Sequence, residues 1–216
     1  MMRMLGMTQI PIPHKTYKWA PVSVVIPTIP PRRSMYYRAL RSVHTQEVAP
    51  EFICVATDLN KRGSAATRNE ALDQVTTEWA AFLDDDDEWL PNHLDVLWNA
   101  ARQTDYDVLY TGCEVVLADG TYLPHEHHIS DWGRFGEEFS EAALRQRSCL
   151  PVTSMVRTGL AKQARFGPPK DVDTPYDDWG FYLRMLDLGA RFLHIPERTW
   201  LWHHHGANTS GQPDRW

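Results

Sequence analysis

The 216-residue chain lacks the long apolar runs that mark membrane proteins and secreted precursors. No run approaches the roughly 18 to 20 apolar residues that a bilayer-spanning helix needs. The opening stretch MMRMLGMTQIPIP also has no uninterrupted apolar core of a signal peptide. The sequence therefore predicts a protein without a transmembrane segment, located in the cytoplasm.

Cysteine is scarce as well. The chain has three cysteines, Cys54, Cys113 and Cys149, which are odd in number and share no close spacing. Disulfide frameworks and zinc knuckles both need paired or closely spaced cysteines. We therefore expect reduced thiols, in agreement with a cytoplasmic location.

Long runs of basic residues are missing too, and the net charge is -6 with a pI of about 5.9. Broad nucleic-acid binding needs clustered Lys and Arg to neutralise a phosphate backbone, so we do not expect it here. A local basic pocket for one nucleotide stays compatible with the sequence, because Lys61, Arg62 and Arg68 lie close together along the chain.

The first half of the chain alternates apolar strands with helical patterns. Residues 1–20 carry two prolines and little periodicity, which predicts an N-terminal arm, and residues 21–216 are long enough for a single domain. Strands are expected at 22–26, 51–57 and 79–84, and helices at 34–46, 63–75 and 91–102. Three such strand–helix pairs predict a parallel, doubly wound sheet that binds ligands at the carboxyl ends of its strands.

The pattern changes after residue 106. A strand pair is expected at 107–117 and 121–125, joined by the turn Ala118-Asp119-Gly120 and followed by a mobile loop over 125–136. The last elements expected are helices at about 137–147 and 177–188, a strand near 152–157, and the closing segments RFLHIP and TWLWHHH.

Four consecutive carboxylates follow the third expected strand, in the segment AAFLDDDDEWL. In an extended chain Asp84 and Asp86 would point to one side, and Asp85 and Asp87 to the other. Two carboxylates about 5 Å apart repel by roughly 3 kcal/mol at an effective dielectric near 20, which a bound Mg²⁺ or Mn²⁺ would relieve. The alternative is a solvated acidic turn that caps the next helix.

Several motifs resemble those of the family 2 glycosyltransferases, which have the GT-A fold. They are the strand VSVVIPT, the helix start GSAATRNEAL and above all AAFLDDDDEWLPNHL, whose acidic run resembles the family's Asp-x-Asp (DXD) motif. YDDWGFYLRMLDLG and HHHGANTSG continue the likeness, which covers about residues 22–210. It implies an α/β, GT-A nucleotide-diphospho-sugar transferase fold, with a mostly parallel, Rossmann-like sheet flanked by helices.

The resemblance also implies roles for single residues. Asp84 and the adjacent Asp85 would contact the nucleotide ribose. Asp84 is also a candidate metal ligand, and Asp86 would be the principal metal ligand. The other residues implied for the donor site are Thr28, Asp58, Gly63, Arg68 and Asn69. The nucleotide-binding part would span about 21–106 and the acceptor-side part about 107–216. The chain departs from the family pattern after the second strand, where CVATD passes directly to LNKRG.

Asp177 and Asp178 stand at the start of an expected amphipathic helix. An inverting glycosyl transfer needs a carboxylate to accept the proton of the acceptor hydroxyl. The resemblance makes Asp178 that base and puts Asp177 where the family has Glu. The alternative is that both residues cap the helix and stabilise its exposed amides.

Histidines form two groups. In WHHHGANTS an extended chain would put His203 and His205 on one face, and the resemblance makes His205 the first and His203 the second candidate for a metal ligand. The alternative is a structural role. The other group is His125, His127 and His128, which we expect to be structural or, if functional, to touch the acceptor.

For two further pairs of residues the sequence allows two alternative roles each. Arg32 and Arg33 follow the first strand, where they would either reach a phosphate or simply begin an exposed helix. Trp132 and Trp179 would either stack on a sugar ring or pack in the core.

Together these features predict a metal-dependent glycosyltransferase that moves a sugar, with inversion, from a nucleoside diphosphate sugar to an acceptor hydroxyl. Imidazole beside carboxylates favours Mn²⁺ over Mg²⁺. Alternatives are a retaining glycosyltransferase or a nucleotidyltransferase on the same fold, or a non-catalytic, cation-binding assembly protein. The sequence leaves open the acceptor, whether glycan, protein, lipid head group or small molecule, and the oligomeric state, with a homo-oligomer among the alternatives.

Overall fold

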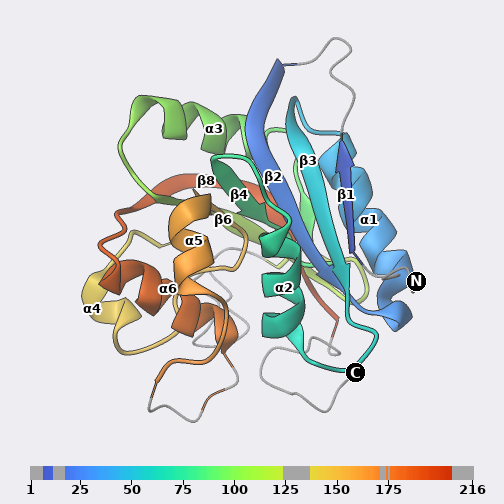
Figure 1. The fold of residues 1–216 in the computed structure, drawn as a ribbon. Coiled ribbons are helices and arrows are strands. Elements are labelled where there is room, and N and C mark those ends of the chain that lie inside the picture. Colours follow the sequence, from blue (N-terminus) through green and yellow to red (C-terminus); the bar gives the residue numbers. More distant parts are fainter. Residues whose placement is uncertain (1–6, 12–17, 124–136, 171–173, 175, 206–216) are drawn as a thin grey trace.

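The computed structural model describes residues 7–11, 18–123, 137–170, 174 and 176–205, which form an α/β fold with helices on both faces of a sheet (Figure 1). Its strands in these ranges are β1 (Met7–Pro11), β2 (Lys18–Thr28), β3 (Val48–Thr57), β4 (Trp79–Phe82), β5 (Glu88–Trp89), β6 (Val108–Leu117), β7 (Ser154–Arg157) and β8 (Phe192–His204). Its helices there are η1 (Pro30–Arg32), α1 (Arg33–His44), α2 (Ser64–Asp73), α3 (His93–Gln103), α4 (Glu141–Leu144), α5 (Thr158–Ala164) and α6 (Asp177–Asp187). Within the same ranges, no helix combines the length and the apolar character needed to cross a membrane.

The strands of the described chain form one eight-stranded sheet in the order β1-β3-β2-β4-β7-β6-β8-β5. Strand β2 runs parallel to β3 and β4, and β6 runs parallel to β8. Strand β7 is antiparallel to both β4 and β6, so the two parallel groups point in the same direction. The mostly parallel sheet is therefore confirmed, and the carboxyl ends of β2, β3 and β4 meet at one edge.

Side chains of the central strands alternate between two cores because successive residues of a strand point to opposite faces. In β2, Val24 and Ile26 pack with residues of α1 and α3, whereas Val25 packs with residues of α2, α5 and α6. All three side chains are fully buried. The β-branched run thus fills both faces of a central strand, as its composition predicts.

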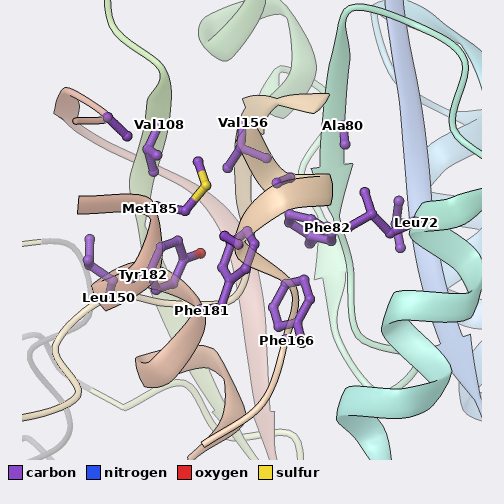
Figure 2. Packing of buried hydrophobic residues seen from close by; sticks show 14 of the residues in the cluster. Leu72, Ala80, Phe82, Val108, Leu150, Val156, Phe166, Phe181, Tyr182 and Met185 are labelled. Carbon is purple, nitrogen blue, oxygen red and sulfur yellow. The ribbon is translucent and has the colours of Figure 1, made fainter. Parts of the chain in front are cut away.

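Aromatic rings pack α6 against the sheet (Figure 2). The rings of Phe166 and Phe181 stack with their centroids 4.0 Å apart, and Phe82 of β4 meets Phe166 edge-on at 4.9 Å. Such pairs each add about 0.5–1.5 kcal/mol beyond the burial of their area. The beginning of α6, which carries Asp177 and Asp178, is therefore held beside the carboxyl end of β4.

The expected elements of residues 21–106 agree with β2, α1, β3, α2, β4 and α3, with shifted boundaries. The prediction of an arm over residues 1–20 is wrong for two segments, because β1 occupies Met7–Pro11 and β2 already begins at Lys18. Strand β1 pairs with β3, some forty residues further along the chain, so its structure depends on a partner that no local pattern reveals. Its position at the sheet edge also explains why a proline is tolerated at its end.

The second half differs more from expectation. The helix expected at 137–147 shortens to α4, and α5 was not predicted. RFLHIP and TWLWHHH belong to one strand, β8, whose register against β6 shifts around Gly112. Of the expected hairpin, the described residues up to 123 show one isolated bridge, between Val116 and Tyr122. The predicted loop at 125–136 lies outside the described residues.

Candidate active site

The four aspartates lie at the carboxyl end of β4, and the chain turns there instead of staying extended. The backbone N–H of Asp87 donates to the carbonyl of Asp84 at 3.2 Å, which closes a turn. As a result, carboxylate oxygens of Asp84, Asp86 and Asp87 all lie within 4.8 Å of one another. The expectation of two carboxylates on each face is therefore wrong, because a turn brings its first and fourth residues together.

Asp85 faces the end of β2 instead. Its carboxylate accepts hydrogen bonds from Thr28 Oγ1 at 2.7 Å and from Arg32 Nη1 at 3.0 Å. Burial raises the pKa of Asp85 to about 6, and the neighbouring Asp86 adds to this, while Arg32 and Thr28 act in the opposite direction. Thr28 and Asp85 thus form one hydrogen-bonded unit that joins the ends of two parallel strands.

The pKa values of the three clustered carboxyls shift in different directions. Burial raises the pKa of Asp84 despite the nearby Arg68, and burial with the adjacent acids raises that of Asp87 well above its usual value. For Asp86, burial is outweighed by His205 and Arg32, and its pKa is lowered. Burial therefore disfavours the charged forms of Asp84 and Asp87, a cost that a divalent cation bound to these carboxylates would offset.

The spacing of these oxygens also fits one ion. Mg²⁺ holds oxygen ligands at about 2.0–2.1 Å, so two oxygens on opposite sides of it lie about 4.2 Å apart. Oxygens of Asp84, Asp86 and Asp87 lie within 4.8 Å of one another, so an inward movement of these side chains would bring them around one ion. The donor set is thus suitable for Mg²⁺ or Mn²⁺.

Three arginines surround the acidic turn. Arg32 Nη1 lies 2.9 Å from Asp86 Oδ2, and Arg68 Nη2 lies 2.7 Å from Asp84 Oδ1. Arg38 Nη2 donates to the backbone carbonyl of Asp86 at 2.7 Å. Arg33, by contrast, is on the surface and donates to the Tyr37 hydroxyl. The structure thus separates the two arginines that follow β2, and only Arg32 reaches the acids.

The histidines at the end of β8 also have different partners. His205 Nε2 lies 3.2 Å from Asp86 Oδ2, whereas His203 Nε2 lies 2.7 Å from Glu88 Oε1. The backbone N–H of His203 donates to Asp87 at 3.1 Å, which ties β8 to the turn. His205 therefore faces the cation site directly, while the ring of His203 is held one residue beyond the aspartates.

The second acidic pair begins α6. Asp177 accepts a hydrogen bond from Ser64 Oγ at 2.6 Å and lies 3.4 Å from Arg68 Nη1. Burial raises the pKa of Asp178 to about 7, with Asp177 contributing in the same direction and Arg68 opposing both. Asp178 also accepts the backbone N–H of Trp179 at 2.8 Å. Arg68 therefore connects this pair with Asp84, and Asp178 is a carboxyl that exchanges its proton near neutral pH.

The side chains of the donor-site candidates Asp58 and Asn69 form hydrogen bonds with backbone groups. Asp58 accepts the N–H groups of Asn60 at 3.1 Å and Gly63 at 2.8 Å. Burial raises its pKa, but the backbone N–H groups of Arg62, Gly63 and Asn60 and the charge of Arg62 outweigh burial and lower it. Gly63 has φ of 92°, a conformation that favours glycine. The amide of Asn69 both donates to and accepts from the backbone of Phe166, at 2.9 Å each. Asp58 and Asn69 thus shape the loop before α2 and fix that helix to the segment after α5.

Some candidates lie elsewhere. Trp179 is 9% exposed and its indole N–H donates to the carbonyl of Leu144 at 2.6 Å, which supports the packing alternative. The candidates outside the described residues are His125, His127, His128 and Trp132.

Glu88 and Arg38 belong to the site but were not among its expected residues. Arg38 Nε lies 3.1 Å from Glu88 Oε1. Glu88 directly continues the acidic run, which is a signal that the sequence does contain. Arg38 comes from the first turns of α1 and has no local signal, because only packing brings that helix to the acidic turn.

Comparisons with known proteins agree with this geometry. The model of the family described as glycosyl transferase family 2 matches residues 38–162, more than half of the chain. Comparison with curated protein sequences gives no significant match.

Solved structures share the fold. S. aureus TarS 1-349 has a TM-score of 0.61 at 21% sequence identity, over 84% of this chain and 60% of that one. Its complex with UDP-GlcNAc has a TM-score of 0.61 at 20% identity, over 85% and 58%. The mannosyltransferase PcManGT from Pyrobaculum calidifontis, in complex with GDP-Man and Mn²⁺, has 0.56 at 14%, over 87% and 57%. The likeness confirms the predicted GT-A fold, and this chain spans about 60% of the length of these structures.

Proposed function

The chain belongs to glycosyl transferase family 2, and we propose that it transfers a sugar from a nucleoside diphosphate sugar to an acceptor hydroxyl with the help of a divalent cation. One observation carries the proposal. The clustered oxygens of Asp84, Asp86 and Asp87 stand at the carboxyl end of β4, and Arg68 connects Asp84 with the acidic pair of α6. Ligands of open α/β sheets bind at this edge.

The proposed cation ligands are Asp84 and Asp86, with Asp87 close by and His205 approaching Asp86 from β8. An imidazole among carboxylates favours Mn²⁺ over Mg²⁺. When bound, the cation would supply positive charge that neutralises the departing diphosphate. His203, whose ring is held by Glu88, would orient the end of β8.

The donor would lie along the ends of β2, β3 and β4. We assign the ribose and base side to Thr28, Asp85 and the loop that Asp58 and Gly63 shape, because these groups form the rim beside the acidic turn. Arg68 would counter the negative charge of the donor site, and Asn69 would position Arg68 through α2. UDP-GlcNAc and GDP-Man, which the neighbouring structures hold, represent the donor class.

Asp178 is the proposed catalytic base. A general base works best with a pKa near the operating pH, and burial raises the pKa of Asp178 to about 7. Asp178 would accept the proton of the acceptor hydroxyl as its oxygen bonds to the anomeric carbon. The bond from that carbon to the diphosphate would break on the opposite face, which inverts the configuration of the sugar. The acceptor would approach from the α6 side, whether it is a glycan, a protein, a lipid head group or a small molecule.

The test is turnover of nucleotide sugars. The protein would be incubated with Mn²⁺ and a panel of donors that includes UDP-GlcNAc and GDP-mannose, and release of the nucleoside diphosphate would be measured. We expect turnover in the wild type that is abolished by EDTA and by Asp86→Ala. Asp105→Ala is the control and should behave as wild type, because the side chain of Asp105 is 92% exposed. Undiminished turnover in a folded Asp86→Ala protein would refute the assignment.

The configuration of the product separates inversion from retention. Proton NMR of the first product formed would give its anomeric configuration, and retention would remove the need for Asp178 as base. A folded protein that binds Mn²⁺ yet consumes no donor would instead be a cation-binding assembly protein.

A further inference from the structure

Arg32 occupies a position that no step of the proposed transfer uses. Its Nη1 atom lies 3.0 Å from Asp85 Oδ1 and 2.9 Å from Asp86 Oδ2, so one nitrogen bridges two carboxylates. The side chain is 14% exposed, and its guanidinium stays charged because Asp86 and Asp85 outweigh burial and raise its pKa. Arg32 therefore acts as a positive charge at the edge of the cation site.

The contacts of Asp86 Oδ2 would make Arg32 and a metal cation compete for this oxygen. A carboxylate oxygen has about two lone-pair directions, and Asp86 Oδ2 already has Arg32 Nη1 at 2.9 Å and His205 Nε2 at 3.2 Å. A cation that binds Asp86 through this oxygen competes with both of them for its lone pairs. Displacing Arg32 also removes a like charge from the vicinity of the cation.

Arg68 is more deeply buried than Arg32. Its side chain is only 5% exposed, its guanidinium carbon lies 4.8 Å from the centre of the Phe166 ring, and it pairs with Asp84 and Asp177. Arg32 instead extends from η1, a single turn that begins with two prolines. Its long side chain can swing while the backbone of η1 stays in place.

On the basis of the proposed function, we propose that Arg32 is a built-in counter-ion of Asp86 that makes binding of the cation depend on the donor diphosphate. Without nucleotide, Arg32 holds Asp86 and competes with the cation. With nucleotide, the released guanidinium pairs with a diphosphate oxygen, an interaction that suits its planar donors. Cation and diphosphate therefore bind cooperatively, and by linkage each raises the affinity for the other by the same factor.

The first arm of the test uses Mn²⁺ alone. Its affinity would be measured by calorimetry, with free Mn²⁺ followed by electron paramagnetic resonance, for wild type, Arg32→Met and Arg33→Met. We expect Arg32→Met to bind Mn²⁺ about tenfold more tightly than wild type. Arg33→Met is the matched control, because Arg33 contacts Tyr37 on the surface and should leave the affinity unchanged.

The second arm repeats the titrations with saturating UDP or GDP. Wild type should bind Mn²⁺ more tightly with nucleotide, Arg32→Met should gain clearly less from nucleotide than wild type does, and Arg32→Lys should lie between them. Wild type alone supplies a further check that needs no variant, since equal Mn²⁺ affinity with and without nucleotide overturns the proposal.

The outcomes separate the two levels of inference. If Arg32→Met and Arg32→Gln melt as wild type does but bind Mn²⁺ no more tightly, the role of Arg32 is overturned and the proposed function stands. If neither wild type nor variant binds Mn²⁺, the cation site is overturned and the role of Arg32 with it.

Discussion

Arg68 Nη2 lies 2.7 Å from Asp84 Oδ1, and this contact joins the turn after β4 to helix α2. The same guanidinium lies 3.4 Å from Asp177 at the start of α6. The buried guanidinium of Arg68 thus sets the spacing between the proposed metal-ion site and the proposed base. Arg68 is buried whereas Asp84 is partly exposed, so replacing either partner should cost less than the roughly 3–5 kcal/mol typical of a fully buried pair.

Substitution of the two histidines should separate their roles. His205→Ala is expected to weaken Mn²⁺ binding about tenfold, because the imidazole 3.2 Å from Asp86 is lost. His203→Ala should weaken it less, since the ring of His203 contacts Glu88. Mn²⁺ titrations of both folded variants would measure this, and equal losses would contradict a direct role for His205.

Asp178 should determine the pH dependence of transfer. A base must be deprotonated to accept a proton, so the rate should rise with pH up to a plateau above a pKa of about 7. Asp178→Asn should lower kcat by about 100-fold or more and remove this limb of the profile. The exposed Asp187, on the last turn of the same helix, provides the matched control Asp187→Asn. An unchanged limb in Asp178→Asn would assign it to another group.

Asn69 should act through stability and not through a direct contact with the donor. Asn69→Ala removes two hydrogen bonds to the backbone of Phe166 and should lower the free energy of unfolding by about 2 kcal/mol. Thermal melting would measure the loss, with Asn99→Ala on the exposed face of α3 as control. If the folded variant lost nucleotide affinity without losing stability, Asn69 would belong to the donor site itself.

Gly180 on α6 is placed where no side chain fits. A Cβ there would come within 2.1 Å of the carbonyl oxygen of Gly167 and 2.5 Å of Pro168, and both are backbone atoms. Gly180→Ala should therefore destabilise the fold by about 1–3 kcal/mol and shift Asp178 with the helix. Gly159→Ala in α5 is the control, because a Cβ there meets nothing within 4 Å. Equal melting temperatures of the two variants would contradict this close packing.

The sequence alone determined the central part of the fold and the location of its acids. The run Val22–Ile26 is short and mostly β-branched, and the segment before Asp84 is short and apolar, so a strand buried on both faces follows from each composition. Helical periodicity is equally local, so α1 and α3 were predictable from it, whereas α2 has almost no such periodicity. An acidic run after such a strand predicted where a cation would be needed, because repulsion among carboxylates depends on their proximity alone.

Only the tertiary structure decided which acids act together. A hydrogen bond between Asp87 and Asp84 brings Asp87 into the cluster, while Thr28 and Arg32 draw Asp85 away from it. Strand β1 likewise exists only through its pairing with β3. The partners of the aspartates and of β1 come from segments that are far apart in the chain. A local sequence pattern contains no information on the energies of such contacts, so only the packed structure shows which partner each aspartate has.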